Sequence, residues 1–145
     1  MKISEAMADY FHYITAVDQK SMKTVESYKN ECAHYLKALN EQGIEDMEAI
    51  TYQAIQQFID ASAKTLSDNS LNHRITCLRL FHEYASTMLN CSNPAVYLKS
   101  KRHGQHLPNY LNKEDVTLLL TRRNESEREL LDVTILELIY GCGLR

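Results

Sequence analysis

The residues whose types and spacing best suit chemistry are the last five of the sequence, Gly141-Cys142-Gly143-Leu144-Arg145. They follow a stretch rich in leucine and isoleucine with helical spacing, so that a glycine-broken turn at the end of a helix delivers one guanidinium. A guanidinium stays protonated, and its planar donors match two phosphate oxygens at once. Such a group suits chemistry at a phosphate, although these five residues by themselves are more often an ordinary solvated chain segment.

The sequence offers little for other kinds of site. The four cysteines are widely spaced and form no Cys-x-x-Cys pair, which is typical of a reduced protein with incidental thiols. His103 and His106 lie on a glycine-containing segment without the further ligands that a metal site needs. No glycine-rich phosphate loop and no Ser-His-Asp arrangement occurs. We therefore expect no metal site.

Apolar residues spaced three and four apart predict an all-α fold, and no stretch alternates with period two for long enough to predict a strand. Four helices are expected first: one from about Ser4, one capped by Ser21 and stopped at Gly43, one capped by Thr51, and one from about Ser70. The residues expected to face the core are Met7, Phe11, Ile14, Val25, Tyr28, Cys32, Tyr35, Leu36, Leu39, Ile55, Phe58, Ile59, Leu71, Ile75, Leu78, Phe81 and Ala85. Helices of this length form a bundle of about ninety residues.

The helical pattern divides the chain into two domains and a linker. Residues 1–93 form the helical domain, because Asn93-Pro94 ends the helical pattern. Residues 94–108 are expected to form a basic linker, with a proline at each end. Residues 109–145 begin a second domain, in which Asn112 and Ser126 are expected to cap two further helices.

Charge is distributed unevenly along the chain, whose formal net charge is -3. Residues 1–60 hold 5 Lys/Arg and 10 Asp/Glu, whereas residues 64–106 hold 6 and 2, and residues 107–145 hold 5 and 7. Positive charge is thus concentrated in the middle, together with His73, His82, His103 and His106. A local basic band can bind phosphates in an acidic protein, because salt screens interactions beyond about 10 Å. No apolar run is long enough for a membrane span, and no secretory signal occurs, so a cytoplasmic location is expected.

Several segments resemble the tyrosine recombinases, the Xer and phage-integrase family of DNA-joining enzymes. Residues 140–145 (YGCGLR) resemble the Tyr-x-(Thr/Cys)-Gly-Leu-Arg motif that presents the first arginine of that family's active site. Residues 21–39 resemble the family's second helix, residues 70–84 its fourth helix, and Asn93-Pro94 its Asn-Pro exit. Residues 107–116 resemble the Leu-Pro-x-x-Leu-(Ser/Thr)-x-Glu-Glu-(Val/Ile) opening of its catalytic domain. The segments occur in the family's order, over roughly residues 4–145.

This resemblance implies an architecture and an activity. The expected architecture is a core-binding (SAM-like) bundle of four to five helices, a linker, and the first helices of a truncated catalytic domain. In the family, Arg145 would bind the non-bridging oxygens of the scissile phosphate and stabilise the transition state. The complete enzyme would cut and rejoin DNA through a 3′-phosphotyrosine, without metal or cofactor. The family's lysine, His-x-x-Arg pair and nucleophilic tyrosine all follow this arginine, so we expect the 145-residue chain alone to be inactive.

The resemblance also implies partners: double-stranded DNA, and other recombinase subunits assembled on it. The residues expected to contact DNA project from the second helix, the fourth helix and the linker: Lys23, Thr24, Ser27, Asn72, His73, Arg74, Arg79, Lys99, Lys101 and Arg102. They would bind phosphates, with one or two reaching base edges. Five or six such contacts predict a log-log salt slope of roughly -4 to -5. The alternative for these helix faces is simple solvation.

A function of another class remains open beside DNA binding. The chain would then be a non-catalytic helical module, derived from a truncated recombinase, that pairs with protein. The last helix supports this alternative, because it is apolar on more than one face. We therefore expect residues 112–145 to be less stable than residues 1–93, or to associate with another chain. Salt-sensitive DNA binding that is lost on Arg74→Ala and Arg79→Ala would distinguish the two functions.

Overall fold

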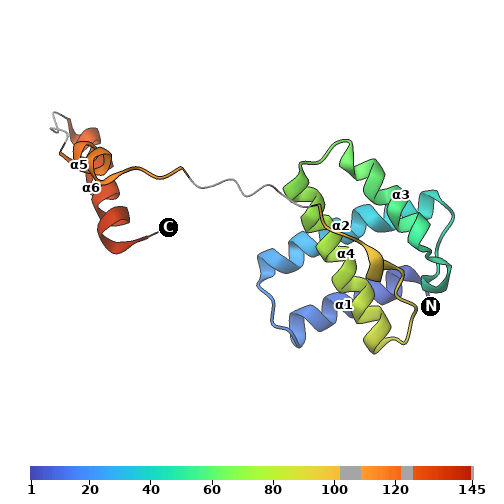
Figure 1. Cartoon of the computed structure of the whole chain (residues 1–145). Coiled ribbons are helices and arrows are strands. Elements are labelled where there is room, and N and C mark those ends of the chain that lie inside the picture. The colour runs from blue at the N-terminus through green and yellow to red at the C-terminus, as the bar shows by residue number, and fades with distance from the viewer. Residues whose placement is uncertain (102–108, 122–125, 145) are drawn as a thin grey trace. The chain divides into compact units, whose positions relative to one another are not determined.

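A computed structural model describes residues 1–101, 109–121 and 126–144, and the chain divides into two compact units, Met1–His103 and Gly104–Arg145 (Figure 1). Within residues 1–101, four α-helices occur: α1 (Ile3–Ala16), α2 (Met22–Glu41), α3 (Tyr52–Ala63) and α4 (Asp68–Met88). Two short 3-10 helices accompany them, η1 (Met47–Ala49) and η2 (Pro94–Tyr97). The described part of the second unit consists of α5 (Lys113–Leu120) and α6 (Glu127–Cys142). The all-α prediction is confirmed.

Side-chain caps set most of the helix starts. Ser21 accepts a hydrogen bond from the Thr24 amide, and Thr51 accepts one from the Ala54 amide, so both predicted N-caps are confirmed. In α4 the cap is Ser67, which accepts from the Ser70 amide at 3.3 Å. The fourth helix therefore begins at Asp68, two residues before the predicted start at Ser70, because Ser67 is its N-cap.

Side-chain caps also begin both helices of the second unit. Asn112 accepts a hydrogen bond from the Asp115 amide at 2.7 Å, and Ser126 accepts one from the Glu129 amide at 3.3 Å. Both predicted caps are confirmed. α6 ends at Cys142, and the next residue, Gly143, has a φ of 62°, in the left-handed region that glycine adopts without strain.

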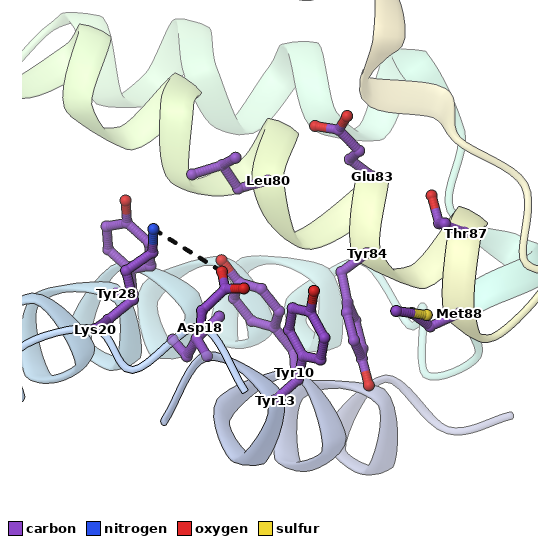
Figure 2. Close-up of a pocket in the computed structure, with 11 residues that line it drawn as sticks. Tyr10, Tyr13, Asp18, Lys20, Tyr28, Leu80, Glu83, Tyr84, Thr87 and Met88 are labelled. Carbon is purple, nitrogen blue, oxygen red and sulfur yellow. Dashed lines mark ion pairs between the residues drawn. The ribbon is translucent and has the colours of Figure 1, made fainter. Parts of the chain in front are cut away.

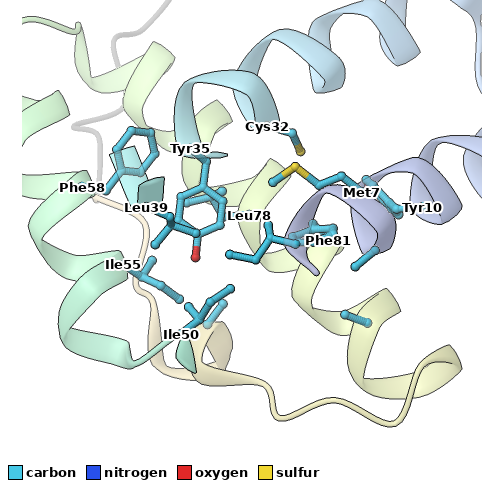
Figure 3. Packing of buried hydrophobic residues seen from close by; sticks show 14 of the residues in the cluster. Met7, Tyr10, Cys32, Tyr35, Leu39, Ile50, Ile55, Phe58, Leu78 and Phe81 are labelled. Atoms are coloured by element: carbon cyan, nitrogen blue, oxygen red, sulfur yellow. The ribbon is translucent and has the colours of Figure 1, made fainter. Parts of the chain in front are cut away.

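The core of the first unit lies among α1, α2, α3 and α4. The helices α2 and α4 each contact the other three, and η2 packs on α3 and α4 (Figure 1). Tyr35, Leu78 and Phe81 are fully buried near its centre (Figure 3). Each such side chain contributes about 1.5–3 kcal/mol relative to an exposed one. All of the predicted core residues are buried in this cluster or packed against it. The apolar periodicity therefore identified the core correctly.

The segment after α4 also packs on the bundle. Ala95 of η2 and Leu98 are buried, and Asn93 caps η2 by accepting a hydrogen bond from the Ala95 amide at 3.1 Å. The described part of the predicted linker, residues 94–101, thus lies against α3 and α4. The remaining part, residues 102–108, lies outside the described residues.

Candidate functional site

The N-terminal halves of α2 and α4 meet through two of the residues predicted to contact DNA. The Ser27 hydroxyl and the His73 imidazole Nε2 lie 2.9 Å apart and form a hydrogen bond between the helices. Tyr28 supports the contact, with its ring centroid 6.1 Å from that of His73. His73 is exposed and Ser27 is half-buried. The two helices therefore present one shared polar surface to solvent.

The same half of α4 holds the basic segment that follows η2. The Asn72 side-chain amide donates to the Lys101 carbonyl at 2.9 Å, and its oxygen accepts from the Lys101 amide at 2.8 Å. The Lys101 ammonium also lies 3.0 Å from a carboxylate oxygen of Asp68. Both ends of this ion pair are about half exposed, so it is worth little and can be exchanged for another anion.

The remaining predicted contacts divide into free cations and capping groups. Lys23, Arg79 and Lys99 are exposed and have no ion-pair partner among the described residues. The Thr24 hydroxyl lies 2.8 Å from the Ser21 hydroxyl and so belongs to the cap of α2. Arg102 and the predicted catalytic Arg145 lie outside the described residues.

The prediction that Arg74 projects away from the apolar face is wrong. Arg74 is only 9% exposed, and its Nε donates to Glu31 Oε2 at 2.5 Å. Its NH1 donates to the buried Ser62 hydroxyl at 2.7 Å, and its guanidinium carbon lies 5.1 Å from the Phe58 ring centroid. The guanidinium therefore joins α2, α3 and α4 inside the bundle, where a phosphate has no access.

His82 likewise does not belong to the basic band in which the sequence placed it. Its side chain is completely buried, and its Nε2 lies 3.0 Å from the Tyr35 hydroxyl. Burial lowers the pKa of His82 to about 4, because the charged imidazolium loses its hydration. The imidazole is therefore neutral at physiological pH and part of the core.

One thiol lies beside the shared surface, but its environment disfavours nucleophilic chemistry. Cys77 Sγ is 3.6 Å from His73 Nε2, an arrangement that in a cysteine nucleophile would lower the pKa of the thiol. Burial instead raises the pKa of Cys77 to about 12, and the charge of Glu31 acts in the same direction. The thiol stays protonated.

Neither a metal-binding cluster nor a membrane-spanning helix occurs among the described residues. Residues 1–101, 109–121 and 126–144 contain no cluster of three or more His, Cys, Asp or Glu side chains placed to hold a metal ion. His103 and His106 fall outside these ranges. Among the described helices, none combines the length and the apolar character needed to cross a membrane.

Comparison with known proteins identifies the first unit. Residues 7–87, more than half of the chain, match the family model described as "Phage integrase, N-terminal SAM-like domain". The chain belongs to this family. The match runs from α1 to the end of α4 and includes Ser27, Asn72 and His73. The family resemblance noted in the sequence is thereby confirmed.

Relatives of this phage-integrase family member extend the similarity beyond the matched domain. The tyrosine recombinase XerC of Haemophilus influenzae is 29% identical over 97% of this chain and 48% of its own length. That of Mannheimia succiniciproducens is 28% identical over 94% and 47%, and that of Staphylococcus saprophyticus 28% over 99% and 48%. The chain thus spans about half the length of these curated relatives. No solved structure matches it significantly.

Proposed function

We propose that this chain is the DNA-binding portion of a site-specific tyrosine recombinase, with double-stranded DNA as its partner. The observation that carries the proposal is the Ser27–His73 hydrogen bond, which joins the polar faces of α2 and α4. Asn72 attaches Lys101 to the same half of α4. Three segments far apart in the sequence therefore present polar and cationic groups side by side, as a surface that follows a nucleic-acid backbone requires.

The groups on this surface suit different parts of a duplex. Lys23 and Lys99 are exposed cations and would bind phosphates. Lys101 can exchange its exposed carboxylate partner, Asp68, for a phosphate. Ser27 and His73 offer a hydroxyl and an imidazole, which can contact a phosphate or a base edge. The chain's net charge of -3 does not oppose this binding, because salt screens distant carboxylates beyond about 10 Å.

In a complete recombinase, Arg145 would hold the scissile phosphate while a tyrosine attacks it and forms the 3′-phosphotyrosine. The 145 residues include no His-x-x-Arg pair, and none of their tyrosines matches the motif of the nucleophile. We therefore propose that a polypeptide of residues 1–145 binds DNA without cutting it, and that further recombinase subunits join it on the DNA. Incubation with a labelled duplex, followed by denaturing electrophoresis, tests this: a covalent adduct would overturn the proposed inactivity.

Fluorescence anisotropy tests the binding itself. The 145-residue chain and its Lys23→Ala and Lys99→Ala variants are titrated into a labelled duplex of about thirty base pairs at several salt concentrations. Lys37→Ala is the matched control, because Lys37 is an exposed lysine of α2 that lies 14 residues beyond Lys23, about 21 Å along the helix. Binding that Lys23→Ala weakens and Lys37→Ala leaves unchanged supports the proposed surface. Equal effects of both substitutions would contradict it.

A helical protein-interaction module is the second candidate function, and the second unit favours it. No residue of α5 or α6 is buried, although α6 carries Leu130, Leu131 and Leu138, each more than half exposed. Exposed apolar residues at this density are typical of a surface that binds protein. Analytical ultracentrifugation distinguishes the candidates: self-association without any DNA binding would favour the second.

A further inference from the structure

A groove of about 250 Å³ lies among α1, α2 and α4 of the bundle, and four tyrosines line it (Figure 2). Tyr10 and Tyr13 come from α1, Tyr28 comes from α2, and Tyr84 comes from α4. The ring centroids of Tyr13 and Tyr84 are 4.9 Å apart, and those of Tyr10 and Tyr84 are 5.3 Å apart. The rings of Tyr10, Tyr13 and Tyr84 therefore form one continuous aromatic wall.

The wall also offers hydroxyl groups to a ligand. Tyr10 is 97% buried, lines the groove, and finds no hydrogen-bond partner for its hydroxyl among the described residues. Burial raises the pKa of the Tyr10, Tyr28 and Tyr84 hydroxyls, so these groups stay protonated and neutral. The Tyr10 hydroxyl oxygen is not one of the fully enclosed atoms without a partner, so water or a ligand in the groove can reach it.

Carboxylates at the rim give the groove its charge. Glu83 is exposed and has no ion-pair partner in the described part of the chain. Asp18 lies 3.8 Å from the ammonium of Lys20, an exposed and long contact that another cation can displace (Figure 2). Among the residues that line the groove, Asp18 and Glu83 against Lys20 leave a net charge of -1, which favours a cation over a phosphate.

Phe11, whose ring packs against that of Tyr10, already has a cation of this chain over its face. Lys29 Nζ lies 5.8 Å from the centroid of the Phe11 ring, and Phe11 packs against Tyr10 at 5.7 Å. A cation within about 6 Å of an aromatic face is attracted by the ring quadrupole. The rings of Tyr13 and Tyr84 also line the groove, as does Glu83, and no lysine of this chain is stacked on them in the described structure.

We propose that this groove binds the cationic side chain, arginine or lysine, of a peptide segment of a partner protein. Its volume of about 250 Å³ lies below the range of about 300–1,000 Å³ typical of small-molecule sites, and it suits one long side chain. Aromatic faces, free hydroxyls and carboxylates together are the groups that recognise an ammonium or guanidinium. The inference is independent of DNA binding.

The test follows the tyrosine ring signals of the full chain by NMR during titration with the capped pentapeptide acetyl-GGRGG-amide. We expect saturable shifts at Tyr13, Tyr28 and Tyr84, whereas Tyr52, Tyr97 and Tyr110, which do not line the groove, stay unchanged. The same peptide with uncharged citrulline in place of arginine should cause no shift. Absence of shifts with the arginine peptide, or equal shifts with both peptides, would overturn the proposal.

Two variants and a control locate the binding. Glu83→Gln, a change at an exposed side chain, should weaken peptide binding about twofold to fivefold. Tyr84→Leu removes a ring face and should weaken it at least about twofold. Glu41→Gln, at the far end of α2, should leave it unchanged. Shifts of the groove tyrosines caused by a DNA duplex and not by the peptide would assign the groove to nucleic acid and overturn the inference.

Discussion

Asn72 holds the backbone of Lys101 through both atoms of its side-chain amide, with hydrogen bonds of 2.9 and 2.8 Å across 29 residues of sequence. Together with the buried Ala95 and Leu98, this contact fixes the path of the chain from the end of α4 back to its beginning. The basic residues after η2 are thereby held beside the first turns of α4, next to His73.

Replacing Asn72 should release this segment. In Asn72→Ala the Lys101 amide loses its acceptor, so its hydrogen exchange should accelerate, and trypsin should cleave faster after Lys99 and Lys101. Asn69→Ala is the control, because Asn69 is an exposed residue of the same helix with no described side-chain partner. Equal cleavage rates for the two variants would show that the amide does not hold the segment.

Arg74→Ala should lower the free energy of unfolding of the bundle, because Arg74 pairs with Glu31 and Ser62 inside it. A broken buried ion pair costs about 3–5 kcal/mol, and we expect about 2–4 kcal/mol here, because the Glu31 side chain retains 19% exposure. Urea unfolding measures the free energy. Arg79→Ala, at an exposed position of the same helix, should change it by less than about 0.5 kcal/mol. A stable Arg74→Ala variant would contradict the structural role of the guanidinium.

The position of Arg74 could have been predicted from spacing, although its residue type suggested otherwise. Arg74 follows Leu71 by three residues and precedes Leu78 by four, so it lies on the buried stripe of α4. His82 follows Leu78 by four and is buried for the same reason. In both cases helical periodicity determined burial. The partners Glu31 and Tyr35, 43 and 47 residues away, could not be predicted, because they depend on how α2 packs on α4.

His82 should make stability depend on pH. Its pKa is lowered to about 4 in the folded state, whereas in the unfolded chain it stays near 6.5, so the unfolded chain binds more protons between these values. The stabilisation is present above pH 6.5 and is lost as pH falls toward 4, by about 3 kcal/mol in all. Urea unfolding from pH 7 to pH 4, with NMR titration of the imidazole, measures both quantities. An imidazole that titrates near its ordinary pKa in the folded protein would contradict the burial.

The two units should differ in stability. The first unit has a large buried cluster, whereas α5 and α6 have no buried residue. Because burial of apolar surface is the main stabilising contribution, amide hydrogens of residues 113–142 should exchange much faster than those of α1 to α4. Mass spectrometry of a monomeric sample measures this difference. Uniform protection across both units would contradict it.

Local signals and long-range contacts differ in how well the sequence predicts them. Ser21, Thr51, Asn112 and Ser126 were predictable as caps, because a cap depends on three neighbouring residues. The Ser27–His73 and Asn72–Lys101 contacts were not predicted as pairs, since each joins separate segments. The structure brings α2, α4 and the segment after η2 together and shows that Arg74 does not belong to their surface, whereas contact of the predicted set with DNA stays a prediction.

The central claim is that α2, α4 and the segment after η2 form one DNA-binding surface. Anisotropy titration of the 145-residue chain into a duplex, at several salt concentrations, tests it most directly. With Arg74 buried, at most five of the predicted cations remain, namely Lys23, Arg79, Lys99, Lys101 and Arg102, so the log-log salt slope should be no steeper than about -4.5. We expect a Kd on the order of 1–100 µM that rises steeply with salt, and a slope that falls by about one unit in Lys23→Ala and in Lys99→Ala. Absence of binding at the lowest salt concentration, or binding insensitive to salt, would contradict the account.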